Sequence, residues 1–528
     1  MNILMICTEK LPVPPVLGGA IQTYIAGILP YLSKKHQITV LGTNHHTLPE
    51  DEIIDGVRYA RIPGKLFEVY KEGVSRFVAA NSFDLIHIFN RPRLILPVRQ
   101  NAPQTKITLS MHNDMFFPEK MDPEEAEMAI KETSKIVTVS DYIGNVIKNL
   151  FPESATKIKT IYSGVDIDRF LPKNHPEMVK TRNSLLRAHG LEDKKVILFA
   201  GRLSRNKGVD KLVRAMAPLS KEFKNLALVI MGGNWFSENK VTDYVAYVRA
   251  LAKRSPVPII TTGFISPDKI HEWFGAADLF VCTSVWQEPL ARVHYEAMAS
   301  GLPIVTTARG GNPEVILPME NGVVVDNPED PNSFAVTIAK VLSNSALMTK
   351  MGSTGRDLAL KNYTWKRVAE DVLNVWNSVN EGLIEESVTN TLNPVSNVNI
   401  ELNDMESFGK WDHFEESSDD PLLTNRRQSI IGQSDKRQRL LHLLTTLKEL
   451  TPSISKENTA NSLSDSLNQI LGNKAIKQSS PNLIQPSNKR NRNYLKTKPD
   501  KRNKKDSKLL DLIKDINMTI NQNKKINE

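Results

Sequence analysis

The chain has 528 residues, of which 40% are hydrophobic and 24% charged, with a formal net charge of +9 and two cysteines. This composition excludes a collagen-like fibre, a wholly disordered chain and a small disulfide-stapled scaffold. Its apolar runs are far shorter than the ~20 residues of a membrane-spanning helix, and its first residues lack the basic start of a signal peptide. We therefore expect a cytoplasmic protein without a transmembrane segment.

The first 380 residues alternate short β-rich runs with longer helical patterns, which is typical of βαβ units and parallel sheets. The strands expected in the first half are Ile3–Cys7, Ile38–Leu41, Leu85–Ile88, Lys106–Ser110 and Ile136–Val139. The pattern then restarts, with strands expected at Lys195–Ala200, Leu226–Met231, Ile259–Thr262, Leu279–Cys282 and Pro303–Thr306. Two doubly wound, Rossmann-like domains are predicted, with the ligand in the cleft between them, because such sheets bind ligands beyond the carboxyl ends of their strands.

The domain boundaries follow from these patterns. We expect an N-terminal domain at 1–168, a linker at 169–194, a C-terminal domain at 195–360, a helix at 361–385 and a tail at 386–528. The helix would begin near Trp365 and present apolar side chains on one face. It would thereby be amphipathic and able to pack against a sheet.

The tail is polar and rich in Asn, Ser and Lys, and its charges are segregated. Residues 381–425 carry a net charge of −10 and residues 426–528 a net charge of +13. This composition predicts a mostly disordered segment. It contains three short apolar stripes at helical spacing: Leu440, Leu443, Leu444 and Leu447; Leu463, Leu467, Ile470 and Leu471; Leu509, Leu512, Ile513 and Ile516. Such stripes can dock into a partner's groove.

Two glycine-containing loops follow predicted strands. Gly18 and Gly19 would stand at a helix start, where their amides can face a ligand, although a plain strand–turn–helix joint explains them equally well. Gly201–Gly208 follows a buried strand and opens a helix. In that loop Arg202 offers a planar fork and Lys207 a point charge to a diphosphate, and a solvated basic loop is the alternative interpretation.

The stretch Trp286–Gly301 gives the strongest signal. We expect a helix from about Leu290 to Ser300, preceded by Pro289 and stopped by Gly301. The amides of Leu290, Ala291 and Arg292 would then face phosphates at the helix N-terminus. Glu288 and Glu296 would lie about 12 Å apart along the helix axis, and each carboxylate could bind a pair of hydroxyls. Two solvated glutamates on an ordinary helix are the alternative.

Other polar residues have weaker claims to a site. His112 follows the strand ending at Ser110 and could contact a sugar, or be structural. Asp166 and Asp168 resemble the D-x-D motif that binds a metal–diphosphate pair, but they lie in an interdomain turn. The adjacent pair His45-His46 has no carboxylate or cysteine at the spacing of a zinc site. Cys7 and Cys282 fall in strands of different halves, which predicts two core thiols. We expect no metal site.

Together these stretches resemble the retaining, nucleotide-sugar-dependent glycosyltransferases of family 4, which have the GT-B fold. The resemblance covers about residues 1–380 and rests on Gly18-Gly19, His112, Gly201-Arg202 with Lys207-Gly208, Glu288 to Glu296, and Gly310–Glu314. It is strongest toward members found in bacterial spore coats. That likeness rests on Glu9–Pro14, Gly18–Gln22, Asn90–Pro92, Val137–Gly144, Tyr162–Asp166 and Trp286–Ile304.

The resemblance implies roles at the matching positions. Arg202 and Lys207 would hold the donor diphosphate, and Glu296 the ribose hydroxyls. Glu288 would bind the donor sugar, and His112 would lie beside its anomeric carbon. Gly19 would let the first loop approach the phosphates, and the final helix would cross back onto the first domain. Because the family works without a metal, cations and amides would stabilise the leaving diphosphate, with no cofactor beyond the nucleotide-sugar substrate.

The resemblance also implies partners. The donor would be a nucleoside-diphosphate sugar, and the acceptor a carbohydrate or coat-component hydroxyl. The tail, residues 386–528, is a candidate contact to other coat proteins, and the location would then be the spore coat. Nucleic acid is an unlikely partner because the basic tail has few aromatic residues and no RNA-binding signature.

One departure from the family and three other functions stay open. Many relatives have Phe-Gly where this chain has Leu290-Ala291, and the alanine methyl narrows the space at that point. The chain could instead be a coat scaffold that keeps the fold with little catalysis. A nicotinamide-dependent oxidoreductase is a further alternative, but the G-x-G-x-x-G motif expected of it is missing after the strand Ile3–Cys7. A nucleotide-sugar epimerase would need no acceptor, so product analysis without acceptor distinguishes it.

Overall fold

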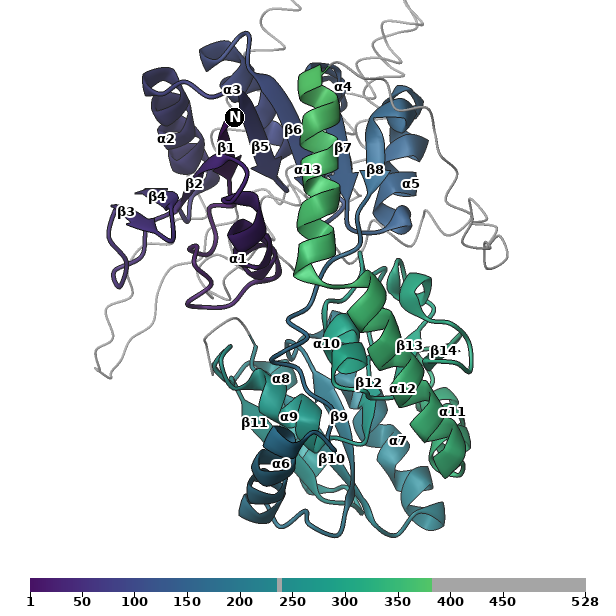
Figure 1. The fold of residues 1–528 in the computed structure, drawn as a ribbon. Coiled ribbons are helices and arrows are strands. Elements are labelled where there is room, and N and C mark those ends of the chain that lie inside the picture. The colour runs from purple at the N-terminus through teal and green to yellow at the C-terminus, as the bar shows by residue number, and fades with distance from the viewer. Residues whose placement is uncertain (235–239, 382–528) are drawn as a thin grey trace, which may run out of the picture. The chain divides into compact units, whose positions relative to one another are not determined.

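The computed structural model describes residues 1–234 and 240–381, which form two α/β lobes within one compact unit (Figure 1). We call residues 1–161 with 365–381 the first lobe, and residues 176–362 the second lobe. Each lobe is built on one sheet whose strands are almost all parallel. Parallel strands are covered by helices on both faces, which explains why their sequences are continuous apolar runs.

The first sheet has eight strands in the order β3-β4-β2-β1-β5-β6-β7-β8. Their bounds are β1 Asn2–Ile6, β2 Gln37–Thr43, β3 Asp51–Ile54, β4 Val57–Ile62, β5 Leu85–Phe89, β6 Lys106–Met111, β7 Lys135–Thr138 and β8 Ile158–Thr160. Only β3 runs antiparallel to its neighbour. One face packs against α1 (Ala20–Leu32) and α13 (Trp365–Glu381). The other packs against α2 (Phe67–Ala80), α3 (Ile95–Asn101), α4 (Pro123–Glu132) and α5 (Asp141–Leu150).

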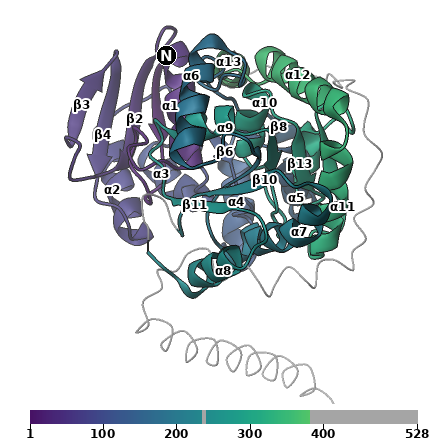
Figure 2. The ribbon, with the colours of Figure 1, turned by 90° about the horizontal axis from the view of Figure 1, so that it is seen from below.

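The second sheet has six parallel strands in the order β11-β10-β9-β12-β13-β14. Their bounds are β9 Lys195–Ala200, β10 Leu226–Met231, β11 Ile259–Gly263, β12 Leu279–Val281, β13 Ile304–Thr307 and β14 Gly322–Val325. On one face lie α6 (Pro176–Ala188), α9 (Ile270–Ala276), α10 (Val293–Ala299) and α12 (Ser345–Asn362). On the other lie α7 (Val209–Glu222), α8 (Asp243–Lys253) and α11 (Pro331–Leu342), so the sheet is the middle layer of three (Figure 2).

The chain crosses between the lobes twice, and the two crossings lie side by side. Val165 lies where the chain passes from the first lobe to the second, and it forms a β-bridge with Thr364, where the chain passes back. Its backbone N–H donates to Tyr363 O at 2.8 Å. Helix α13 then covers the first sheet with Trp376, which is fully buried. The indole Nε1 of Trp376 donates to His87 Nδ1 at 3.2 Å. The last described helix therefore completes the core of the lobe in which the chain began.

The two-domain, parallel-sheet expectation is confirmed, and all ten expected strands are present, with ends that differ from the expected ones by no more than two residues. Four strands were missed: β3, β4, β8 and β14. The stretch 169–194, expected as a linker, contains α6, which packs on α9 of the second lobe. Cys7 and Cys282 are buried free thiols. The tail 386–528 and its three apolar stripes lie outside the described residues.

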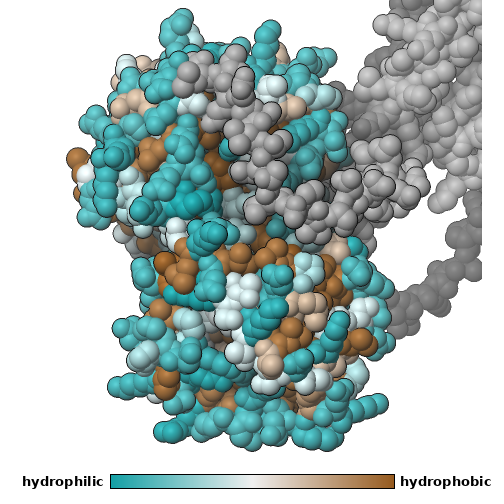
Figure 3. Space-filling model, turned by 45° about the vertical axis from the view of Figure 1, so that its right-hand side comes forward, coloured by the Kyte–Doolittle hydropathy of each residue, from teal (hydrophilic) through white to brown (hydrophobic). Residues whose placement is uncertain are grey.

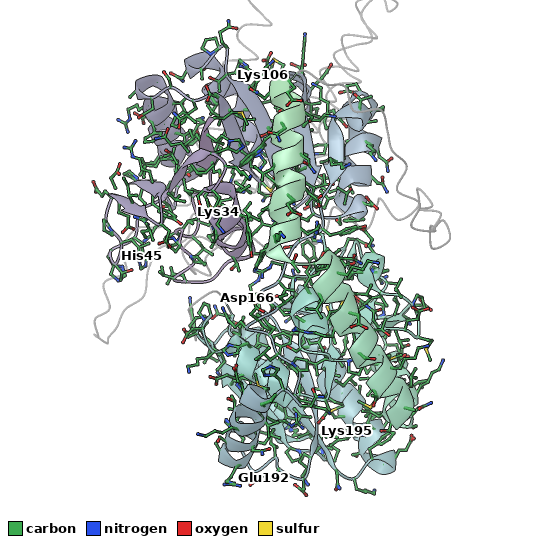
Figure 4. The ribbon with its side chains drawn as sticks, viewed as in Figure 1. Lys34, His45, Lys106, Asp166, Glu192 and Lys195 are labelled. Carbon is green, nitrogen blue, oxygen red and sulfur yellow. The ribbon has the colours of Figure 1, made fainter. Side chains whose placement is uncertain are left out.

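Both sheets direct the carboxyl ends of their parallel strands toward the junction of the lobes. Lys106 and Lys195, the first residues of β6 and β9, lie at the outer ends of their lobes, whereas Asp166 lies at the junction (Figure 4). On the face drawn in Figure 3, hydrophobic side chains gather on the second lobe where it borders the first. Loops that follow the strands of either lobe therefore meet at this junction, where a doubly wound fold places its ligands.

Candidate active site

The loop after β9 carries two of the predicted cations. It contains Arg202, which is partly buried, and a short 3-10 helix, Arg205–Lys207. Gly208 follows with φ of +62°, and α7 begins at the next residue. Thr283 Oγ1 donates to Lys207 O at 2.6 Å, which ties this loop to the end of β12. Lys207 is thereby fixed at the carboxyl ends of two neighbouring strands.

Glu288 is buried and shares one oxygen among three donors. Its Oε2 accepts from Lys207 Nζ at 2.5 Å, from Ser284 Oγ at 2.8 Å and from Trp286 Nε1 at 2.8 Å. Burial alone would raise the pKa of Glu288, but the Lys207 ammonium and the three hydrogen bonds hold the pKa below its usual value. The pair is therefore an ammonium and a carboxylate, held at the end of β12 where a sugar phosphate could separate them.

The turn that carries Glu288 is held by the segment Gly310–Glu314. Gly311 N donates to Glu288 O at 2.8 Å, and Ala291 N donates to Asn312 Oδ1 at 3.2 Å. The expected helix from Leu290 to Ser300 is therefore wrong at its start: α10 begins at Val293, three residues later. Because Asn312 occupies the Ala291 amide, that group is not one of the free helix-terminal donors that the sequence suggested.

A substitution of Gly310 tests how tightly this turn is packed. Gly310 has φ of +55°, and a Cβ at this position would lie 1.9 Å from Glu288 O. We expect Gly310→Ala to lower the free energy of unfolding by about 1–3 kcal/mol, because both the backbone conformation and the contact are strained. Urea denaturation measures this change. Gly190→Ala is the matched control, since Gly190 has a similar φ of +64° and open space around it; an equal loss in both variants would show that the contact with Glu288 is unimportant.

Arg292 and Glu296 form an ion pair at the start of α10. Arg292 Nη2 lies 3.3 Å from Glu296 Oε1, and the guanidinium lies over the ring of Trp365, 5.5 Å from its centroid. Burial raises the pKa of Glu296, against the opposing charges of Arg292 and Arg169, because the ionised carboxylate loses hydration. Arg292 Nε has no hydrogen-bond partner among the described residues. The side chain of Arg292 is thus part of the site together with Glu296, whereas the sequence predicted a role only for its backbone amide.

His112 lies at the carboxyl end of β6 in the first lobe. Its backbone N–H and that of Asn113 each donate to Asn90 Oδ1 at 2.9 Å, and its ring meets Tyr24 edge-on with centroids 5.0 Å apart. Burial, with a contribution from the Arg292 charge, lowers the pKa of His112 to about 3, so the imidazole is neutral at pH 7. Its Nε2 has no hydrogen-bond partner within the described part of the chain.

Because the charge of Arg292 in the second lobe contributes to the lowered pKa of His112 in the first, residues of both lobes belong to this part of the site. The structure groups Lys207 with Glu288, and Arg292 with Glu296 and His112. Gly18 and Gly19 have φ of +83° and +103°, and Gly19 caps the N-terminus of α1, the helix whose Tyr24 meets His112. The close neighbours of Gly19 are Gln22 and Leu11 of its own loop and helix, so its contacts are those of a strand–turn–helix joint.

Several residues at the junction were missed from the sequence. Ser284 and Trp286 donate to Glu288, Asn312 fixes the turn, and Glu314 contacts the other lobe. The signal for Asn312 and Glu314 was the block Gly310–Glu314, which belongs to the family pattern but received no role, and Trp286 is the first residue of the stretch Trp286–Gly301, in which only Glu288, Glu296 and three amides received one. Asp166, by contrast, accepts the backbone N–H groups of Asp168 and Arg169 and so closes its own turn.

Comparisons with known proteins match these two lobes. A family model described as "Glycosyltransferase Family 4" matches residues 18–169, and one described as "Glycosyl transferases group 1" matches residues 182–358. The chain is 40% identical over 376 residues to the Spore coat protein SA of Bacillus subtilis (strain 168), covering 71% of this chain and 99% of that relative. It is 24% identical over 385 residues to the Lipopolysaccharide 1,2-N-acetylglucosaminetransferase of Salmonella typhimurium, covering 70% and 96%.

Solved structures share the arrangement of the lobes. Sucrose-phosphate synthase from Thermosynechococcus elongatus has a TM-score of 0.61 at 20% identity, and HepE from Anabaena in complex with UDP has a TM-score of 0.57 at 20% identity. Each comparison covers 72% of this chain and all of the other. With this fold, two matched family models and a relative 40% identical along nearly its whole length, the chain belongs to the group 1, family 4 glycosyltransferases of GT-B fold.

Proposed function

We propose that the protein transfers a hexose from a nucleoside-diphosphate sugar to an acceptor hydroxyl with retention of anomeric configuration. The observation that carries this proposal is the Lys207–Glu288 pair at the junction of the lobes. A diphosphate offers Lys207 a doubly anionic partner, and a sugar offers Glu288 hydroxyl donors in place of the ammonium. Both groups of the pair thus have a matching group on one donor molecule.

The leaving diphosphate would be stabilised by positive charge that is already in position. Lys207 is fixed by its loop and by Trp286, whose ring centroid lies 5.4 Å from Nζ, and Arg202 stands five residues earlier in the same loop. Fixed charges aimed at a developing anion need no reorganisation, which is why they lower barriers effectively. Lys207 and Arg202 would supply this stabilising charge.

Glu296 and His112 would bind the two ends of the donor. Burial raises the pKa of Glu296, but the Arg292 charge opposes that rise and favours the carboxylate, whose oxygens would accept from ribose hydroxyls. His112 is neutral, so it would act through a hydrogen bond of Nε2 to a sugar hydroxyl rather than through charge. No carboxylate is assigned as a covalent nucleophile; a donor phosphate oxygen would take the acceptor proton.

Titration calorimetry of the full chain with UDP-glucose, GDP-mannose and ADP-glucose tests the donor. The proposal expects saturable heat with at least one of them. If that donor is UDP-glucose, slow hydrolysis with water as acceptor should first release α-glucose, which NMR distinguishes from the β-anomer. The absence of saturable heat with all three, or initial release of β-glucose, would contradict the proposal.

A second candidate function is a structural one in a spore coat, because a relative 40% identical is named for that location. In that role the protein would keep the fold as an interaction surface, with little or no catalysis. None of the helices in the described ranges combines the length and apolar character needed to span a membrane. A variant without donor binding that still assembles into the coat would favour the structural role. Removal of residues 386–528 tests whether that segment anchors the protein there.

A further inference from the structure

One carboxyl group of the second lobe is bound to a helix of the first. Glu314 belongs to a 3-10 helix, Asn312–Val315, and its side chain reaches the N-terminus of α5. Asp141 N donates to Glu314 Oε2 at 2.8 Å, and Tyr142 N donates to Glu314 Oε1 at 2.7 Å. These are the first two amides of α5, which have no partner inside the helix.

The next amide of α5 is satisfied differently. Ile143 N donates to Ser140 Oγ at 3.2 Å, an N-cap supplied by the first lobe itself. The N-terminus of α5 is therefore completed by two sources, one within the lobe and one across the junction. The helix dipole favours negative charge at this position, so it opposes burial and the Asp141 carboxylate, which both favour a protonated Glu314.

Residues 310 and 311, which precede Glu314 in the chain, are hydrogen-bonded to the turn that carries Glu288. Gly311 N donates to Glu288 O at 2.8 Å, and Gly310 N donates to Gln287 Oε1 at 2.6 Å. On the α5 side, a Cβ on Gly311 would lie 2.9 Å from Ser140 Cβ, so the two lobes are in close contact here. Residues 310–314 thus connect α5 of the first lobe to the turn that carries Glu288.

Unlike an ordinary helix cap, this cluster has two carboxyl groups, Glu314 and Asp141, that compete for one hydroxyl proton. Tyr162 Oη lies 2.9 Å from Glu314 Oε2 and 3.2 Å from Asp141 Oδ2, but its single hydroxyl proton can be donated to only one of them. If Glu314 is protonated, its O–H donates to Tyr162 Oη, and the tyrosine donates to Asp141. All three groups are then satisfied.

The surroundings favour that protonated form. Burial raises the pKa of Glu314 to about 7, and the Asp141 carboxylate adds to the rise, although the donated hydrogen bonds oppose it. The other charged or titratable groups around this cluster are Tyr295, Tyr363 and Arg367. Arg367 donates to Tyr162 O at 2.7 Å and pairs with Asp371, so its charge is partly balanced.

We propose that Glu314 is a positioning residue that holds the two lobes together, fixing the Glu288 turn against α5. Its bearing on sugar transfer rests on the function proposed above, but the contact itself does not. Since the protonated acid fits the cluster, the contact is strongest at low pH. It weakens as the pH rises from about 4.5 to about 7, where Glu314 loses its proton.

Hydrogen–deuterium exchange of the full chain, read at single amides by NMR or by electron-transfer fragmentation, tests this proposal. In Glu314→Ala, the protection factors of the Asp141 and Tyr142 amides should fall at least tenfold, while Ile143 stays protected by Ser140. In the wild type, protection of the first two amides relative to Ile143 should decrease between pH 5 and pH 8. Glu314→Gln should retain more protection than the alanine variant and lose the pH dependence.

Glu320→Gln is the matched control, because Glu320 is an exposed glutamate of the same lobe, six residues further along the chain. Equal protection of Asp141 and Tyr142 in the wild type and Glu314→Ala, or an unchanged pH dependence in Glu314→Gln, would overturn the proposal. Addition of UDP supplies a separate arm: increased protection at these two amides in the wild type, absent in Glu314→Ala, connects the contact to the donor side. If calorimetry shows no saturable heat with any of the three nucleotide sugars, the proposed function fails, whereas the exchange measurements on Glu314→Ala and Glu314→Gln still test the contact.

Discussion

Replacing Lys207 with alanine should weaken donor binding by about 10- to 150-fold, corresponding to the loss of about 1.5–3 kcal/mol from one charge-assisted hydrogen bond. The substitution also leaves Glu288 buried without its cation, which costs stability because an unpaired buried carboxylate is unfavourable. Calorimetry with the donor identified for the wild type measures the binding change. Transfer by the variant should fall at least as much, because the charge on the leaving diphosphate grows during the reaction.

Two further variants separate these effects. Lys207→Ala with Glu288→Gln removes the unpaired charge and should recover much of the lost stability without recovering donor affinity. Lys211→Ala is the control, since Lys211 is a lysine four residues away that pairs with the exposed Glu329. Donor affinity in Lys207→Ala equal to that of Lys211→Ala would contradict the assignment of Lys207.

Replacing Trp376 with alanine should lower the free energy of unfolding by about 3–5 kcal/mol, the range for truncating a large aromatic side chain in a core. Trp376 is fully buried between α13 and the first sheet, and its indole N–H is donated to His87. Burial lowers the pKa of His87 to about 3, so the imidazole is neutral and Nδ1 can accept that hydrogen bond. Urea denaturation followed by circular dichroism measures the loss.

Trp376→Phe distinguishes packing from hydrogen bonding, because phenylalanine fills most of the space but donates nothing to His87. Its cost should therefore be smaller than that of the alanine variant. Val336→Ala is the surface control: Val336 lies on α11 with 71% of its side chain exposed and should change stability by no more than about 0.5 kcal/mol. A similar small change in Trp376→Ala would show that α13 contributes little to the first lobe.

Strands buried on both faces could be located from the sequence because each is a continuous apolar run. β9 and β10 agree with their predicted bounds at both ends. Of the missed strands, β3, β4 and β8 lack such runs, whereas β14 is a short apolar run that was overlooked in the sequence. β3 lies at the sheet edge and is mostly exposed, and β4 contains two arginines. The turn Asp55-Gly56 between them has positive φ at both residues and was the available signal for this hairpin.

The charged residues of the site were predictable from their place after strands, but their contacts were not. Glu288 and Lys207 are 81 positions apart, and nothing local to either indicates that they pair. The start of α10 was misjudged because an asparagine twenty-one residues further along binds the Ala291 amide. Glu314 has the largest separation, 173 residues from Asp141, so its contact depends wholly on how the two lobes meet.

The position of α13 constrains the order in which this protein can mature on the ribosome. The strands of the first sheet are made early, yet the helix that covers one of their faces emerges only after every strand of the second sheet has been synthesised. The apolar face later covered by Trp376 and its neighbours must therefore stay unprotected for most of translation. A nascent chain halted before residue 365 should expose that face to chaperones, whereas one halted far enough beyond residue 381 for α13 to have left the exit tunnel should not.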